Sequence, residues 1–302
     1  MQEWQLKIEL FVNYLKLEKS LSHNSVVAYK EDVHKLASFA SANGLSPLEI
    51  DAFHLRSFIK SIVEVGLNPR SQSRILSGIK AFFKFLLLED MISEDPAALL
   101  ETPRIGRKLP ETLSLQEIDI LQAGHDLSTP EGRRNKAIIE VLYSCGLRVS
   151  ELVSLKISNL YFSEGYIRVI GKGNKERLVP ISPRAIKDIH DYLPDRNGMD
   201  IKVEHENILF LNRRGAGLTR VMIFTIVRNL AEVVGLKKII SPHTFRHSFA
   251  THMVEGGADL RSVQEMLGHE SIITTEIYTH LDREYLRDAI LRFHPRAQKD
   301  NM

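Results

Sequence analysis

The stretch YIRVIGKGNKERLVPI, residues 166–181, decides the fold class of this 302-residue chain. Two short segments rich in β-branched residues, Tyr166–Ile170 and Arg177–Ile181, flank the turn-forming residues 171–175, GKGNK. This order of strand, glycine-rich turn and strand predicts a β-hairpin. The other segments with a regular apolar pattern follow the period of a helix. The sequence therefore predicts a mainly α fold with a small β-sheet or hairpin.

The first hundred residues are predicted to be helical. Apolar residues recur at three- and four-residue steps from Trp4 to Leu17, and similar patterns cover residues 24–40 and 51–65. A further helix begins near Pro69, because proline suits the first turn of a helix. Its basic residues form either a solvated face or a stripe that faces phosphates; they are Arg70, Arg74, Lys80 and Lys84.

Residues 101–110, ETPRIGRKLP, contain prolines, a glycine and basic residues with almost nothing to bury. This composition is typical of a linker between domains. We therefore expect a helical domain over residues 1–100 and a second domain over residues 111–302, which opens with a helix capping box at Ser114. An apolar stripe from Leu281 to Phe293 ends the chain, and it is buried either in its own domain or in a neighbouring protomer.

Composition indicates little about function. The chain has 40 basic and 38 acidic residues, a net charge of +2, so any DNA-binding surface must come from cations gathered on one face. Hydrophobic residues make up 43% and charged residues 26%, and no apolar run approaches the roughly 20 residues of a membrane helix. With no signal peptide and one cysteine, Cys145, a cytoplasmic protein without membrane association is expected.

The stretch GLRVSEL, residues 146–152, places Arg148 at a junction between two helices. At such a junction a guanidinium can grip two phosphate oxygens, and Glu151 can orient it from behind. The alternative is a simple Arg–Glu pair at a helix start. Lys172 at the tip of the hairpin is likewise either a solvated turn lysine or a functional residue.

A third group comprises HTFRH at residues 243–247, LGH at 267–269, and Tyr278. The spacing of three puts His243 and Arg246 on one helix face, and Gly268 is placed to end a helix just before His269. Cleaving a phosphodiester without a metal needs cations around the phosphorus, a nucleophile and a proton donor for the leaving oxygen. The chain supplies a residue for each need, so the catalytic candidates are Arg148, Lys172, His243, Arg246, His269 and Tyr278.

The closely spaced histidines raise the alternative of a metal site. His243 and His247 are four residues apart, which suits two ligands on one helix. However, the chain has no HExxH motif and no cysteine pair, and Arg246 would place a positive charge beside the ion. We therefore expect neither a metal ion nor another cofactor.

Together these motifs, in this order and spacing, resemble the tyrosine recombinases, the phage integrase family, and most closely the bacterial XerC/XerD-type recombinases. The resemblance spans nearly the whole chain and includes LSHNSVVAYKEDV at residues 21–33 and FHPRA at residues 293–297. It implies a helical DNA core-binding domain and a mixed α/β catalytic domain that clamp a duplex between them. The acidic stretch at residues 200–206 has no place in the resemblance.

The resemblance also implies a role for each candidate. Tyr278 would form a 3′-phosphotyrosyl bond and release a 5′ hydroxyl, and Lys172 would protonate the leaving oxygen. The side chains that hold the phosphate would be Arg148, His243, Arg246 and His269, with Glu151 in the acidic position behind them.

The implied substrate is a double-stranded DNA recombination site bound by a tetramer. A paralogous XerC/XerD-type recombinase and a DNA translocase at the septum are the further partners it implies. The expected function is the resolution of chromosome dimers at segregation. One alternative is an integrase of a mobile element with the same chemistry, which the lack of an arm-binding domain disfavours. The other is an architectural DNA-binding protein that does not cut, which the presence of Tyr278 and Lys172 disfavours.

Overall fold

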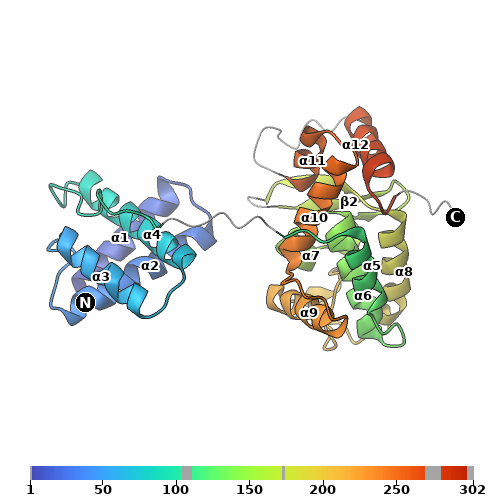
Figure 1. Cartoon of the computed structure of the whole chain (residues 1–302), viewed down its shortest axis with the longest axis horizontal. Helices are drawn as coiled ribbons and strands as arrows, with labels where there is room; N and C mark the ends of the chain where they lie inside the picture. Colours follow the sequence, from blue (N-terminus) through green and yellow to red (C-terminus); the bar gives the residue numbers. More distant parts are fainter. Residues whose placement is uncertain (1, 104–110, 172–173, 269–279, 298–302) are drawn as a thin grey trace. The chain divides into compact units, whose positions relative to one another are not determined.

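The computed structural model describes residues 2–103, 111–171, 174–268 and 280–297, with the backbone alone for residues 280–285. The chain divides into two compact units, Met1–Lys108 and Leu109–Met302 (Figure 1). Each unit has its own apolar core. None of the described helices is both long enough and apolar enough to cross a membrane.

Helices build the first unit, as predicted. Trp4 stacks on Phe82 with ring centroids 5.9 Å apart, and Phe11 meets the same ring edge-on at 5.4 Å. These aromatic side chains are fully buried, so they join the first and last helices through one core. Proline at residue 69 lies in the first turn of its helix, as expected. The helices are α1 Gln2–Leu17, α2 His23–Ala42, α3 Ala52–Glu64 and α4 Pro69–Leu88.

The basic residues of α4 are not equivalent. Arg74 donates from Nη1 to Oδ2 of Asp32 at 2.6 Å, and Asp32 is a fully buried residue of α2. Arg74 therefore neutralises a buried carboxylate, while its own side chain is 44% exposed and either reading, a solvated face or a phosphate-facing stripe, stays open for it. Arg70 and Lys84 are exposed and stay open to either reading.

The second unit combines helices with a small antiparallel sheet in the order β1-β2-β3. Strand β2, Tyr166–Ile170, matches the prediction, whereas β3, Glu176–Pro180, begins one residue early because Glu176 pairs with Ile170. The strand β1, Leu160–Tyr161, is too short to leave a sequence pattern. The helices are α5 Leu115–Ala123, α6 Pro130–Ser144, α7 Val149–Val153, α8 Pro183–Asn197, α9 Arg220–Val233, α10 Pro242–Glu255, α11 Leu260–Leu267 and α12 His280–Phe293.

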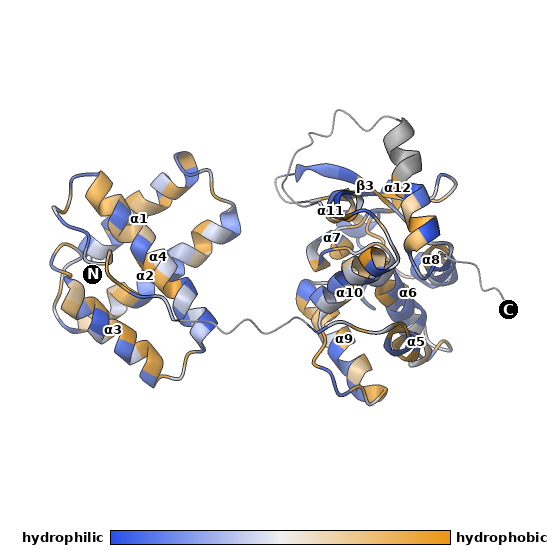
Figure 2. Ribbon diagram, turned by 45° about the horizontal axis from the view of Figure 1, so that its top comes forward, coloured by the Kyte–Doolittle hydropathy of each residue, from blue (hydrophilic) through white to orange (hydrophobic). Residues whose placement is uncertain are grey.

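Helix α6 is the central element of this unit. Every residue from Ala137 to Ser144 is buried, because α5, α8 and α10 all pack against this helix. Other helices carry hydrophobic and hydrophilic residues on different faces, as the colouring in Figure 2 shows. The predicted capping box at Ser114 is present at the start of α5.

The acidic stretch at residues 200–206 lies between α8 and α9 and includes the short 3-10 helix Val203–His205. The backbone N–H of Lys202 donates to the carbonyl of Gly215 at 3.1 Å. The buried guanidinium of Arg196 donates to the carbonyl of Ile208, just beyond the stretch. Backbone contacts therefore hold this segment, and its acidic residues are exposed.

The apolar stripe of α12 packs, in its second half, in the core of its own unit. Leu286, Ala289 and Ile290 are buried there, and Phe293 packs against the same cluster. For these residues the first alternative is confirmed, because the C-terminal stripe is buried in its own domain. The side chains of Leu281 and Tyr285 lie outside the described residues.

Candidate active site

The turn at Gly146 sets the position of Arg148. Gly146 has a φ of +58°, and a Cβ on it would lie 2.6 Å from Cδ1 of Phe249, so a larger residue would be both strained and crowded. This turn ends α6 and leads directly into α7, with Arg148 at the N-cap. The predicted junction of two helices is confirmed.

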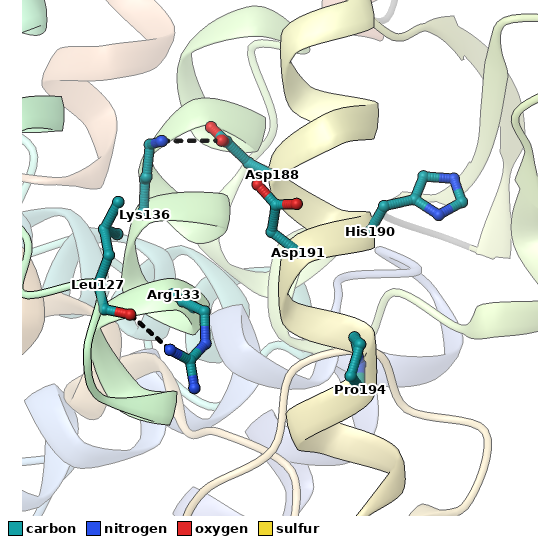
Figure 3. A pocket seen from close by; sticks show the side chains of 7 residues that line it. All are labelled: Leu127, Arg133, Lys136, Asp188, His190, Asp191 and Pro194. Atoms are coloured by element: carbon teal, nitrogen blue, oxygen red, sulfur yellow. Dashed lines mark hydrogen bonds and ion pairs between the residues drawn. The ribbon is translucent and has the colours of Figure 1, made fainter.

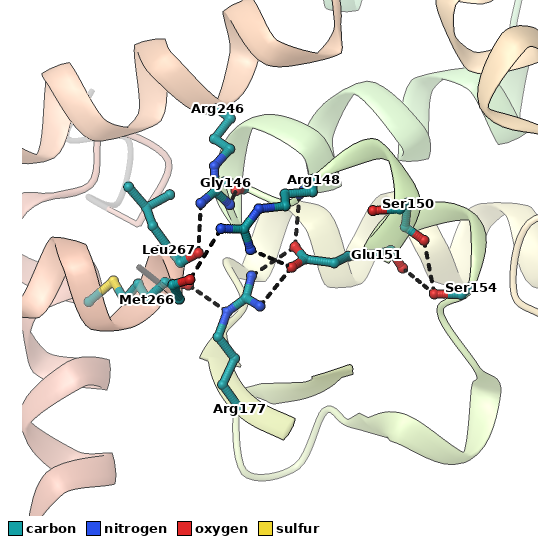
Figure 4. A network of polar contacts seen from close by, with 10 residues as sticks. Gly146, Arg148, Ser150, Glu151, Ser154, Arg177, Arg246, Met266 and Leu267 are labelled. Carbon is teal, nitrogen blue, oxygen red and sulfur yellow. Dashed lines mark hydrogen bonds and ion pairs between the residues drawn. The ribbon is translucent and has the colours of Figure 1, made fainter. Parts of the chain in front are cut away.

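Glu151 is the centre of a buried polar network (Figure 4). Its Oε2 accepts from the backbone N–H of Arg148 at 2.8 Å, and its Oε1 accepts from Nη1 of Arg148 at 2.9 Å. Arg177 fills the remaining positions, with Nη1 at 2.8 Å from Oε1 and Nη2 at 2.8 Å from Oε2. Glu151, only 3% exposed, therefore accepts four hydrogen bonds, more than the simple Arg–Glu pair of the alternative reading provides.

Sequence reasoning did not select Arg177. The residue lies on β3 in a run whose alternate positions, Arg177 and Val179, are both buried. A charged residue on the inward face of a strand is unusual, because burying a charge needs a partner. The strand alternation therefore contained a signal for Arg177, and its partner Glu151 was already a candidate.

Arg148 and Arg246 converge at the end of α11. Arg246 donates from Nη2 to the carbonyl of Leu267 at 2.6 Å and from Nη1 to the carbonyl of Gly146 at 2.7 Å. Arg148 donates from Nη2 to the carbonyl of Gly268 at 3.1 Å. The two guanidinium groups thus bind carbonyls of consecutive residues, although they come from distant parts of the chain. Gly268 ends α11 in the left-handed conformation, as predicted.

The electrostatics of this cluster favour an anion. Burial, and next to it the nearby charge of Arg148, lowers the pKa of Arg246 to about 10, so the guanidinium stays charged at neutral pH. Burial opposes the ionisation of Glu151, but the hydrogen bonds and charges of Arg177 and Arg148 outweigh it and hold its pKa below the usual value. Three cations therefore surround one carboxylate, which leaves a local excess of positive charge.

The segments that carry the other candidates border this cluster. Gly171, next to Lys172, is so close to Glu151 that a Cβ on it would lie 3.6 Å from Oε1. Gly268, next to His269, has its carbonyl bound to Arg148. His243 is exposed in the first turn of α10, one turn before Arg246. Lys172, His269 and Tyr278 themselves lie outside the described residues.

Two of the described histidines, His252 and His294, lie against the ring of Tyr143. The hydroxyl of Tyr143 lies 2.9 Å from Nδ1 of His252, and burial lowers the pKa of this histidine. This pairing gives the His252 side chain a structural role within the unit. Within the ranges that the structure describes, no group of three or more histidine, cysteine, aspartate or glutamate residues is placed to hold a metal ion.

A separate pocket of about 320 Å³ lies between α6 and α8 (Figure 3). Its two basic side chains already have partners within the unit: Lys136 pairs with Asp188 at 3.1 Å, and Arg133 pairs with Asp195. Both basic residues belong to the first half of α6, whereas the arginine cluster follows the end of this helix. The pocket is therefore distinct from the arginine cluster.

Comparison with known proteins identifies the family. Residues 113–284 match the model of the phage integrase family, and residues 8–90 match the phage integrase N-terminal SAM-like domain. The chain belongs to the phage integrase family of tyrosine recombinases. It is therefore a site-specific recombinase, an enzyme that breaks and rejoins DNA strands.

Relatives match this recombinase over nearly its whole length. It is 44% identical to tyrosine recombinase XerD of Chlorobaculum tepidum, over 98% of both chains. It is 41% identical to tyrosine recombinase XerD of Listeria monocytogenes, over 96% of this chain and 99% of the relative. Among solved structures, XerH bound to a palindromic difH substrate has the same fold, with a TM-score of 0.72, 24% identity and 95% coverage of both chains.

Proposed function

We propose that this recombinase cuts DNA by attack of the Tyr278 hydroxyl oxygen on a backbone phosphorus. A P–O bond forms to the tyrosine and the bond to the 5′ oxygen breaks, which leaves a 3′-phosphotyrosyl ester and a free 5′ hydroxyl. Attack by a second 5′ hydroxyl reverses the step and joins the new strand pair. The ester conserves the energy of the broken bond, so the reaction needs no nucleotide cofactor.

One observation carries this proposal: Arg148 and Arg246 bind carbonyls of the consecutive residues Leu267 and Gly268. Two guanidinium groups so placed can share one phosphate and stabilise the charge that builds up on its non-bridging oxygens. In the proposal His243 and His269 assist them, and Lys172 protonates the leaving 5′ oxygen. The closeness of Gly171 to Glu151 supports a position for the lysine beside the same phosphate.

The biological role proposed is the resolution of chromosome dimers in the cytoplasm. The XerD relatives, which match over nearly their whole length, support this role over integration of a mobile element. Four protomers would act on two duplexes, with a paralogous recombinase or a septal translocase as further partners. Deleting the gene should leave unresolved chromosome dimers at division. If this chain restores dimer resolution in cells that lack a second recombinase, the paralogous partner is removed from the proposal.

A nicked suicide duplex tests the chemistry. Its recognition site is first selected from a random duplex library for binding to the wild-type chain. The nick lets the short fragment that carries the released 5′ hydroxyl diffuse away, so the strand cannot be rejoined. The phosphotyrosyl adduct therefore accumulates and is resolved on a denaturing gel. We expect Tyr278→Phe to bind the duplex and form no adduct, because phenylalanine lacks the nucleophile.

Tyr161→Phe, a half-exposed tyrosine of the same unit, is the matched control and should form adduct at the wild-type rate. An adduct in the Tyr278→Phe protein would show that another residue is the nucleophile. Binding without any adduct in the wild-type chain would instead support an architectural DNA-binding protein.

A further inference from the structure

The Glu151 carboxylate is shared unequally between its two arginines. Arg177 binds it with two parallel N–H···O bonds of 2.8 Å, whereas the side chain of Arg148 makes one bond of 2.9 Å. The Arg177 side chain is 7% exposed, and that of Arg148 is 32% exposed. The buried guanidinium is therefore the main partner of the carboxylate, and the more accessible one keeps N–H groups for another ligand.

A buried carboxylate takes the best cation within reach, because an unpaired charge is costly in an apolar interior. Without Arg177, the nearest cation left for Glu151 would be Arg148. A two-point grip on Arg148 would neutralise its charge and turn its planar fork away from a phosphate. The bond between Arg177 and Glu151 thus determines how much positive charge Arg148 presents.

Arg177 also connects the segments that border the cluster. Its Nε donates to the carbonyl of Met266 at 2.9 Å, at the end of α11. The same guanidinium lies so close to the turn of Gly268 that a Cβ there would be 3.2 Å from Nε. Since Arg177 stands on β3, it links the hairpin, α7 and the end of α11 through one side chain.

We propose that Arg177 is a positioning residue for strand cleavage. It occupies Glu151, which leaves Arg148 free and charged for the scissile phosphate, and it fixes the hairpin and the end of α11 around that phosphate. This inference rests on the proposed function, since it assigns Arg177 a part in the same reaction.

Single-turnover adduct formation on the selected nicked duplex tests the proposal. Arg177→Met should form adduct at least tenfold more slowly than wild type, with the DNA dissociation constant changed less than threefold, because the lost charge acts mainly in the transition state. The double variant Arg177→Met/Glu151→Gln should regain at least a threefold faster rate than Arg177→Met, because the neutral amide no longer competes for Arg148. Thermal unfolding scans set a temperature at which every variant is folded.

Arg196→Met is the matched control. Arg196 is also a buried arginine of the second unit, but its guanidinium binds backbone carbonyls beyond α8. Its removal should lower stability and leave the rate of adduct formation per folded molecule at the wild-type value. Where Arg177→Met does not fold, Arg177→Lys replaces it. A defect smaller than tenfold but clearly measurable is expected, because lysine keeps the charge and loses one of the two parallel bonds to Glu151.

The outcomes separate the two proposals. Adduct formation at the wild-type rate by Arg177→Met, or by Arg177→Lys in its place, would overturn this inference and leave the proposed function standing. Equal rates for Arg177→Met and its double variant would also overturn it, since relief by the second substitution is what a purely structural role does not give. If the wild-type chain forms no adduct, the proposed function fails and takes this inference with it.

Discussion

Two carboxylates buried in the second unit, Glu151 and Glu140, lie near arginines but are satisfied very differently. Glu151 accepts four hydrogen bonds of 2.8–2.9 Å. Glu140 accepts one, from Nε2 of Gln122 at 2.8 Å, and Oε1 has no partner among the described residues. Its arginines are more distant, with Nε of Arg184 at 3.8 Å and Nε of Arg296 at 3.6 Å.

The two pKa values diverge accordingly. Burial raises the pKa of Glu140 to about 7, because its long ion pairs only partly offset the loss of water. Burial acts on Glu151 in the same direction, but the close bonds from Arg177 and Arg148 lower its pKa below the usual value. Whether a buried carboxylate stays charged therefore depends on the geometry of its hydrogen bonds, and arginines nearby are not sufficient.

The largest effect is expected on the free energy of unfolding when either buried glutamate is replaced by glutamine. Glu151→Gln should lower the free energy of unfolding at pH 7 by about 3–5 kcal/mol, because an amide cannot accept all four bonds and leaves the buried Arg177 without its carboxylate. Glu140→Gln should not lower it, because the amide oxygen can still accept from Gln122 and the variant carries no buried charge at this position. Urea unfolding of the full chain measures both.

An equal loss of unfolding free energy in the two variants would contradict this difference between the two carboxylates. It would show that burial outweighs hydrogen-bond geometry. A loss at position 140 larger than at position 151 would reverse it. Ser163→Ala, an exposed loop position, serves as a control and should stay near the wild-type value.

The second effect is the pH dependence of the unfolding free energy that is due to Glu140. Its pKa is raised from an ordinary value of 4.5 to about 7 in the folded chain, so the folded state binds the extra proton between these values. The stabilisation is present in full below pH 4.5 and is lost as the pH rises to 7. We expect the unfolding free energy of wild type, relative to Glu140→Gln, to fall by up to about 3 kcal/mol across this window.

His294 must be separated from this effect. Burial, and next to it Arg296, lowers the pKa of His294 to about 3, so its contribution rises with pH and opposes that of Glu140. Because both proteins retain His294, the difference between their curves isolates the carboxylate. A difference that is flat from pH 4.5 to 7 would mean that Glu140 is not protonated in the folded chain.

The smallest effect concerns the first unit, where Asp32 is a third buried carboxylate. Arg74 binds it at 2.6 Å and Lys35 at 3.3 Å, and Arg74 is half-exposed. Arg74→Met should cost about 1 kcal/mol, because Lys35 remains and water screens the lost pair. Thermal unfolding and DNA affinity are measured together, with the exposed Arg70→Met as the comparison. A loss of DNA affinity without a loss of stability would assign Arg74 to the phosphate-facing stripe.

Much of the fold was predictable, because its signals are local. The apolar periodicity from Trp4 onward, the proline at the start of α4 and the glycine-rich hairpin each fix a conformation through their immediate neighbours. The strand β1 was missed because two residues carry no period, and β3 was placed one residue late because its register is set by pairing across the sheet.

The site was predictable in its residue types but not in its pairing. The motifs selected Arg148, Glu151 and Arg246, which the structure brings together. They did not select Arg177, because its importance comes from a carboxylate that lies far away in the chain. The partner of Arg74 was missed for the same reason, since Asp32 lies on another helix.

The sequence by itself determined the family, the order of the helices and the inventory of cations and of a tyrosine for phosphate chemistry. Only the tertiary structure decided which arginine holds which carboxylate, and hence that Glu151 is charged while Glu140 holds its proton up to about pH 7. The physical reason is that secondary structure depends on neighbouring residues, whereas the energy of a buried charge depends on the distance and direction of donors that folding brings from elsewhere.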